Sequence, residues 1–109
     1  WGHPTGRLLL ERNGYAVNFD VLFTTAKKHG VTIEINAHPK RLDLDWRLCR
    51  SAKEKGIRFS INPDAHSTRG LSDVKFGVGI ARKGWLEKKD IINTMSVSEM
   101  GQFLKGRRR

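Results

Sequence analysis

A helical segment, a glycine and an alternating strand follow one another twice in this chain of 109 residues, and this repeat limits the possible folds more than any other feature. In the first repeat, apolar residues at helical spacing run from Phe19 to Ala26 behind Asn18, a suitable N-cap, and the helix is expected to end at Gly30. Residues 31–36 then predict a strand. A glycine between a helix and the next strand is typical of a parallel sheet.

The second repeat has the same order. Asp43 or Asp45 can cap a helix that ends at Gly56, and residues 57–62 predict a second strand. We expect the two strands to be adjacent and parallel, joined by the helix at residues 44–55.

The last third of the chain has a weaker pattern. Residues 71–83 have helical spacing that two glycines interrupt, and Ser96 with Glu99 matches a capping box before a short final helix. We expect a single domain over residues 1–105 and a basic tail at residues 106–109. We also expect two bulky residues beyond the strands, Trp46 and Trp85, to lie in the core with Cys49.

Both predicted strands alternate between apolar and polar residues. In the first strand, the polar positions are Thr32, Glu34 and Asn36. A parallel sheet with helices on both sides is usually apolar on both faces. A polar face fits either a barrel with a polar interior or an antiparallel sheet with one wet face, and the intervening helices favour the barrel. The sequence therefore predicts an α/β fold.

The chain is strongly basic, with 21 lysines and arginines against 11 acidic residues and a formal net charge of +10. Such a charge attracts polyanions, so nucleic acid is an expected partner, although charge alone does not establish it. No apolar run approaches the roughly 20 residues of a membrane helix, so no membrane partner is expected. The single cysteine, Cys49, excludes an internal disulfide and suits a reducing, cytoplasmic compartment.

The polar face of the second strand continues into Asp64 and His66. In an extended segment, residues i and i+2 lie on the same side, so both side chains are expected to point to one site. Carboxylate and imidazole groups suit zinc, manganese or iron, and the end of a strand is a common place for a site in α/β folds. An Asp-x-His pair also occurs often by chance, so this pair alone is a weak signal.

A second cluster, Gly-His-Pro-Thr-Gly-Arg at residues 2–7, has the composition of a loop. Arg7 could bind a phosphate with its planar guanidinium. The alternative is an exposed turn in which His3 is incidental.

Four stretches of the sequence carry a family resemblance: residues 2–12, 34–47, 61–68 and 77–86. In this order they resemble the C-terminal part of the PHP (polymerase and histidinol phosphatase) domain of family X DNA polymerases, and they span nearly the whole chain. The resemblance implies a portion of a distorted (β/α) barrel with metal ions at the C-terminal ends of its strands. It also implies that His3, Asp64 and His66 are metal ligands.

The resemblance implies a metal-dependent phosphoesterase, a 3′–5′ exonuclease or related DNA end-processing enzyme, attached to a repair polymerase. Arg7 and Arg41 are then expected to bind phosphate, and His38 is a weaker candidate for a proton donor. The tail residues Arg107, Arg108 and Arg109 are candidates for contact with nucleic acid.

The sequence also departs from the family. The family domain opens with a His-x-His strand and further ligands that these residues lack, and His38 stands where the family pattern has asparagine. We therefore expect little or no activity from the chain alone, a need for the remainder of the PHP domain and the polymerase module, and self-association through an open sheet edge. Two alternatives are a small-molecule phosphatase related to histidinol phosphatase and a non-enzymatic basic module that binds DNA.

Overall fold

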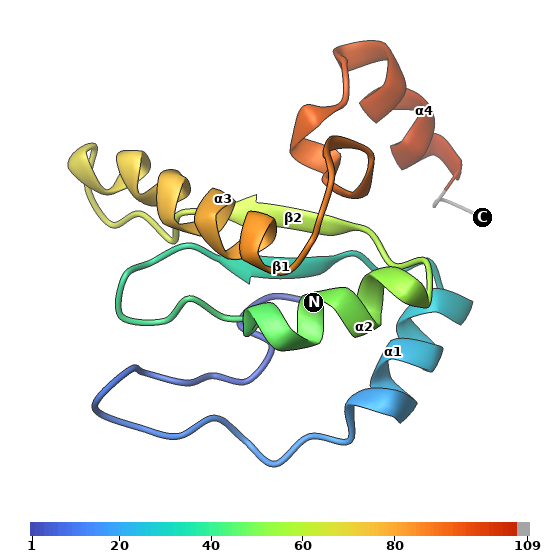
Figure 1. Cartoon of the computed structure of the whole chain (residues 1–109). Coiled ribbons are helices and arrows are strands. Elements are labelled where there is room, and N and C mark those ends of the chain that lie inside the picture. The colour runs from blue at the N-terminus through green and yellow to red at the C-terminus, as the bar shows by residue number, and fades with distance from the viewer. Residues whose placement is uncertain (107–109) are drawn as a thin grey trace.

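The computed structural model describes residues 1–106 and has helices packed around a parallel pair of strands (Figure 1). Strand β1 (Ile33–Asn36) pairs with β2 (Phe59–Asn62) in parallel, and helix α2 (Trp46–Glu54) lies between them in the sequence. The predicted pairing is therefore confirmed. None of the helices in the described part of the chain is long and apolar enough to cross a membrane.

Single residues extend the sheet at both edges. The amino group of Trp1 donates to the carbonyl of Thr32 at 2.8 Å, and the N–H of Glu34 donates to the carbonyl of Trp1 at 2.9 Å. At the other edge, Ile91 forms a parallel bridge with Phe59. The segments therefore follow the order of the sequence across the sheet, as in a (β/α) barrel. Residues 1–106 form two strands and no closed barrel.

The first two helices begin where side-chain caps place them. Helix α1 (Phe19–Lys28) starts after Asn18, whose side chain accepts from the N–H of Val21 at 3.2 Å. Helix α2 starts after Asp45, whose carboxylate accepts from the N–H of Arg47 at 2.9 Å. Asp45 is therefore the cap of α2, and Asp43 has another role.

Helix α3 (Val74–Lys83) follows a short 3₁₀ helix, η1 (Arg69–Asp73), and packs closely on the strands. A Cβ added at Gly77 would lie 2.5 Å from the Cγ2 of Ile61 and 2.7 Å from the Cβ of Ala37. The glycine that weakened the helical pattern is thus the residue that allows the helix to approach the sheet.

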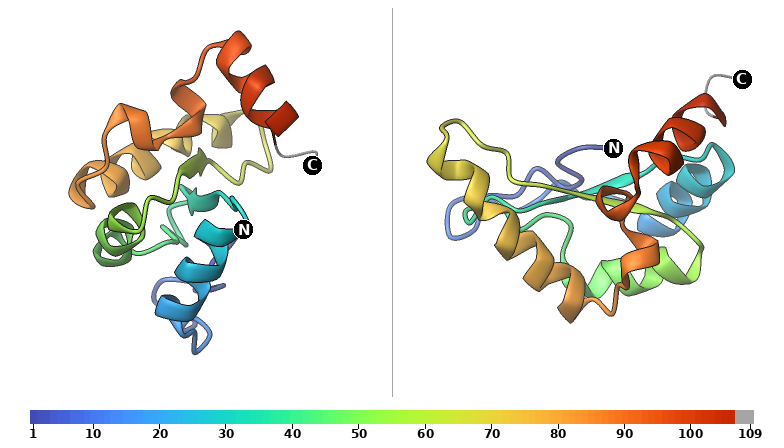
Figure 2. Two further views of the ribbon diagram at one scale, coloured as in Figure 1. Left: turned by 90° about the vertical axis from the view of Figure 1, so that its right-hand side faces the viewer. Right: turned by 90° about the horizontal axis from the view of Figure 1, so that it is seen from above.

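Two short 3₁₀ helices, η2 (Lys88–Asp90) and η3 (Ile92–Thr94), lead to α4 (Val97–Gly106), which projects away from the sheet (Figures 1 and 2). The predicted capping box is confirmed, because the N–H of Ser96 donates to Glu99 at 2.7 Å and the N–H of Glu99 donates to the Ser96 hydroxyl at 3.3 Å.

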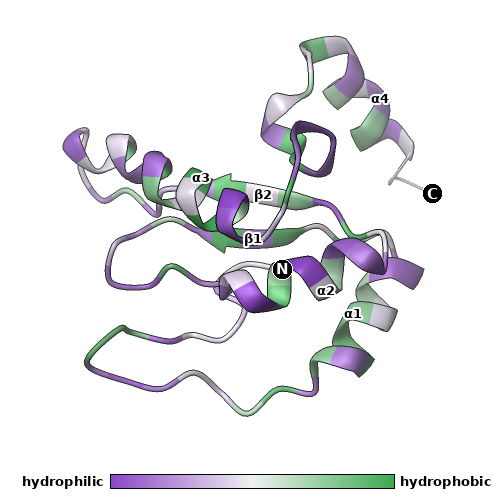
Figure 3. Cartoon of the chain, viewed as in Figure 1, coloured by the Kyte–Doolittle hydropathy of each residue, from purple (hydrophilic) through white to green (hydrophobic). Residues whose placement is uncertain are grey.

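The core lies between the apolar face of the strands and the inner faces of the helices. Figure 3 shows hydrophobic residues concentrated along β1 and mixed with hydrophilic ones on the helices. Ile33, Ile35 and Phe59 are fully buried, and burial raises the pKa of Cys49 to about 12, so its thiol stays protonated. The prediction for Trp85 is wrong, since its side chain is 70% exposed in the turn after α3.

Candidate functional site

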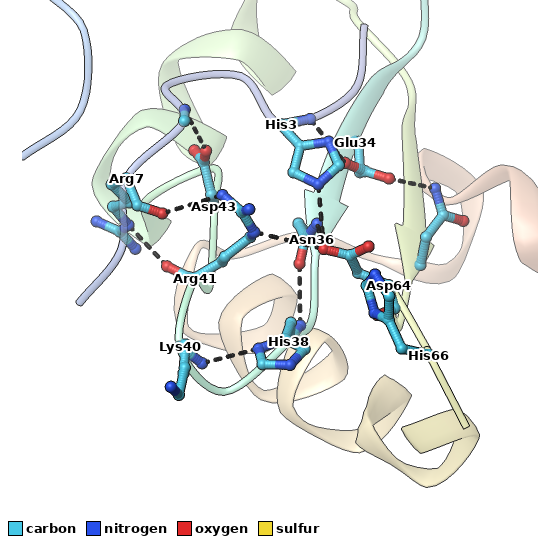
Figure 4. Close-up of polar contacts among 12 residues, drawn as sticks. His3, Arg7, Glu34, Asn36, His38, Lys40, Arg41, Asp43, Asp64 and His66 are labelled. Atoms are coloured by element: carbon cyan, nitrogen blue, oxygen red, sulfur yellow. Dashed lines mark hydrogen bonds and ion pairs between the residues drawn. The ribbon is translucent and has the colours of Figure 1, made fainter. Parts of the chain in front are cut away.

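Polar side chains from three segments meet at the carboxyl ends of the strands (Figure 4). His3 comes two residues after Trp1, Asn36 ends β1 and Asp64 comes two residues after β2. The His3 Nε2 lies 3.1 Å from the Asp64 Oδ2, and the Asn36 Nδ2 donates to the same oxygen at 3.0 Å. Parallel strands end at one edge of a sheet, which brings together residues that are far apart in the sequence.

The Asp64 carboxylate is the centre of this cluster. Its Oδ2 also lies 3.4 Å from the Nε of Arg41. Burial alone would raise the pKa of Asp64, but hydrogen bonds from Asn36 and His3, together with the neighbouring imidazoles of His3 and His66, lower it below its usual value. The carboxylate is therefore ionised at neutral pH and presents a negative charge.

The polar face of the strands holds the backbone of His3 in place. The Glu34 Oε2 accepts from the N–H of His3 at 2.7 Å, while its Oε1 accepts from the Asn62 Nδ2 at 2.8 Å. Asn62 in turn accepts a hydrogen bond from the Ser60 hydroxyl at 2.9 Å. The predicted polar face is thus a hydrogen-bonded network that supports the cluster.

Asp43 is a supporting residue that the sequence pattern presented only as a possible helix cap. It is fully buried, and its Oδ2 accepts from the N–H groups of Thr5 and Gly6 at 2.9 and 3.0 Å. Its backbone pairs with Asn36 through hydrogen bonds of 3.1 and 2.5 Å. Asp43 therefore links two segments, the loop that contains His3 and the end of β1.

The guanidinium of Arg7 is bound to the loop after β1 and to the cap of α2. Its guanidinium donates to the carbonyl of Arg41 at 2.9 Å, to the carbonyl of Leu42, and to the Asp45 Oδ2 at 3.0 Å. These contacts occupy the planar guanidinium and hold the loop after β1 in place, while the binding of phosphate by Arg7 stays a prediction. Of the two candidate arginines, the one beside Asp64 is Arg41.

The backbone that leads from Asp64 to His66 does not have the extended geometry on which the prediction for His66 rested. The backbone of Asp64 is left-handed, with φ 53°, which breaks the alternation of sides on which the prediction rested. The Nδ1 of His66 instead lies 2.8 Å from the backbone carbonyl of Asp64.

Two of the three predicted metal ligands, His3 and Asp64, lie at the separation of groups that share one ion, and the role of His66 as a ligand stays a prediction. Groups that bind one metal at about 2 Å lie roughly 3 Å apart, as the imidazole of His3 and the carboxylate of Asp64 do. Across residues 1–106, no group of three or more histidine, cysteine, aspartate and glutamate side chains is arranged to hold an ion.

Three of the five non-glycine residues that have a positive φ within residues 1–106 lie in the loops around this cluster. His3, Leu42 and Asp64 have φ values of 46°, 45° and 53°. Residues other than glycine rarely adopt this left-handed conformation, and where they do, they cluster at functional sites.

His38 lies in the loop after β1, close to this cluster (Figure 4). Its N–H donates to the Asn36 Oδ1 at 3.0 Å, and its ring Nδ1 accepts from the N–H of Lys40 at 3.2 Å. A ring nitrogen that accepts carries no proton, so these contacts assign the proton of the neutral ring to Nε2. The predicted contacts of Arg107, Arg108 and Arg109 lie outside the described residues.

One curated protein gives these positions a context. The chain is 45% identical over 103 residues to the DNA polymerase/3′-5′ exonuclease PolX of Bacillus subtilis (strain 168). The match covers 94% of this chain and 18% of the length of that relative. No family model matches the chain. The similarity fits the C-terminal part of the PHP domain of a family X DNA polymerase.

Proposed function

We propose that this chain supplies part of the active site of a metal-dependent phosphoesterase that removes nucleotides from the 3′ ends of DNA, within a family X repair polymerase. The observation that carries the proposal is the contact of 3.1 Å between His3 and Asp64 at the carboxyl ends of the strands, beside the cation of Arg41. The 45% identity to a relative named as a polymerase and 3′-5′ exonuclease supports it.

In this proposal His3 and Asp64 hold a divalent ion, with His66 as a further ligand through its Nε2. Zinc, manganese or iron at this position would lower the pKa of a water molecule and neutralise phosphate charge. Asn36 orients the Asp64 carboxylate, and Glu34 fixes the backbone of His3. Arg41 brings a positive charge to the place where a phosphate would lie, next to Asp64.

The remainder of the site would come from outside this sequence. Two well-placed ligands do not saturate a metal ion, and the chain spans 18% of the length of its relative. We therefore expect little or no hydrolysis by the chain alone, and activity when it is part of a protein of the relative's full length. A net charge of +10 suits DNA as the substrate.

The test is hydrolysis of a 5′-labelled single strand by the full-length protein that contains this sequence. We expect His3→Ala and Asp64→Asn to reduce the rate by at least roughly 100-fold, because each removes a metal ligand. The matched control is His29→Ala, an exposed histidine at the end of α1 that lies away from the strand ends. Full activity in both ligand variants would refute the proposal.

The high positive charge also favours a second candidate, a module that binds DNA without catalysis. In that case DNA binding would survive chelation and both ligand variants, and no hydrolysis would be seen. Hydrolysis of a free phosphomonoester without hydrolysis of DNA would instead identify a small-molecule phosphatase.

A further inference from the structure

A groove lies directly beside Asp64, between the loop after β1 and the segment formed by η1 and the start of α3. It encloses about 490 Å³, within the roughly 300–1,000 Å³ of small-molecule sites. The side chains that give it its chemistry are His38, Asp64, His66, Arg69, Lys75 and Phe76. The groove thus starts at the candidate site and continues away from it along one wall of α3.

An aromatic ring and a cation stand together on that wall. Phe76 is 40% exposed, although its neighbour Gly77 is buried against the strands. The Lys75 Nζ lies 5.1 Å from the centroid of the Phe76 ring. An exposed contact of this kind is weak, so a stacking group can displace the ammonium from the ring while leaving it nearby.

The opposite wall of the groove contains His38, whose Nε2 is a hydrogen-bond donor in the neutral ring. The hydrogen bond from the N–H of Lys40 to Nδ1 assigns the proton of the neutral His38 ring to Nε2, and Asn36 holds the backbone of His38 through its N–H. Nε2 can therefore donate to a phosphate oxygen without the ring having to carry a positive charge.

The charge of the groove is balanced. Asp64 and Asp73 offset Arg69 and Lys75 along its lining, so charge alone gives no strong attraction for a small anion. A ligand that binds well must use the Phe76 ring as well as the donors. A nucleotide unit has both a flat base and a phosphate, and surfaces for single strands combine aromatic rings with cations in this way.

We propose that this groove binds the nucleotide next to the scissile phosphate of a single-stranded DNA end. Its base stacks on Phe76, while His38 and Lys75 bind the flanking phosphates. The inference rests on the proposed function for the direction of the strand, and it adds the residues that hold the base.

The test is fluorescence anisotropy with the 109-residue chain in the presence of a chelator. The probes are a 5′-labelled oligothymidylate and an abasic strand of the same length and charge, which together separate the contribution of the bases from that of the phosphates. We expect the wild-type chain to bind oligothymidylate roughly tenfold more tightly than the abasic strand, because base–aromatic stacking adds about this much affinity.

Phe76→Leu should remove that preference while leaving binding of the abasic strand unchanged. The matched control is Trp85→Leu, which removes an aromatic ring of 70% exposure that does not line the groove, and it should keep the preference. Circular dichroism checks that each variant is folded. A wild-type chain without a preference, or a preference that survives Phe76→Leu, would overturn the assignment of the groove.

The chelator separates this test from that of the proposed function. If ligand variants abolish hydrolysis but Phe76→Leu keeps the base preference, the proposed function stands and the groove assignment fails. If Phe76→Leu removes the preference but His3→Ala and Asp64→Asn keep full hydrolysis, the groove stands as a site for single strands and the proposed function fails.

Discussion

Single carboxylates hold together the loops that carry the candidate site. Asp43 binds two backbone N–H groups of the loop after His3, and Asp45 caps α2 while it binds Arg7. Asp64 gathers its partners at the strand ends. Local sequence separates these three residues poorly, because the partners that distinguish them, Thr5, Arg7 and Asn36, lie 28 or more residues away.

Replacement of Asp43 tests whether its hydrogen bonds to the loop after His3 stabilise the fold. Asp43→Ala leaves two buried N–H groups without an acceptor, so we expect the free energy of unfolding to fall by about 2–4 kcal/mol. Asp43→Asn keeps an acceptor oxygen and should cost clearly less. Urea unfolding measures both, with Asp20→Ala, whose side chain is 88% exposed, as a control that should stay within about 0.5 kcal/mol of wild type. Equal losses in the two Asp43 variants would contradict this role.

Asp45 should make stability depend on pH. Hydrogen bonds from the Arg47 side chain lower the pKa of Asp45 well below its usual 3.8. The N–H of Arg47 and the side chain of Arg7 lower this pKa further, while burial partly opposes them. A lowered pKa in the folded state stabilises the protein above the ordinary pKa, and this stability is lost as the pH falls through and below that value.

We therefore expect Asp45→Asn to be about 1 kcal/mol less stable than wild type at neutral pH, because the variant lacks the charged cap and its ion pairs. Between roughly pH 5 and pH 2 the wild type should lose more stability than the variant, so the two curves converge. Urea unfolding at several pH values gives both curves. Parallel curves would show that Asp45 is not the group that titrates, and Asp20→Asn should retain the wild-type pH dependence.

At the scale of elements, the helices and strands near the site could be predicted because their signals are local. Asn18 and Asp45 cap their helices through contacts within three residues, and Gly30 and Gly56 follow the helices with φ values of 63° and 76°. The same local logic failed at His66, since the rule for i and i+2 assumes an extended backbone. The left-handed Asp64 is fixed among tertiary contacts that no local pattern contains.

The two glycines of α3 offer a matched test of how this helix meets the sheet. Gly77→Ala places a methyl group 2.5 Å from Ile61 and should cost about 1–3 kcal/mol of stability. Gly79→Ala meets nothing within 4 Å and should stabilise the helix by about 0.5–1 kcal/mol. Thermal or urea unfolding of both variants decides the matter, and a stabilising Gly77→Ala would show that α3 does not pack as described.

At the scale of the whole molecule, the parallel segments lie in sequence order and place the site residues on one side. Both edges of the sheet are covered in part, by Trp1 beside β1 and by Asn93, whose side chain makes hydrogen bonds of 2.8 and 2.9 Å with the backbone of Ile61. This coverage leaves fewer unpaired groups to drive self-association, which stays a prediction, as does the barrel. The periodicity of the two helix–strand repeats cannot reveal further strands of a barrel or a bound metal ion, because both depend on residues outside those repeats.

The central claim is that His3 and Asp64 bind one metal ion, and the most direct measurement is the broadening of backbone amide NMR signals by Mn²⁺, which detects even weak binding. We predict that signals near His3, Asn36 and Asp64 broaden first, that Asp64→Asn and His3→Ala abolish this effect, and that His29→Ala retains it. Broadening confined to other surfaces, or an unchanged pattern in both ligand variants, would contradict the account.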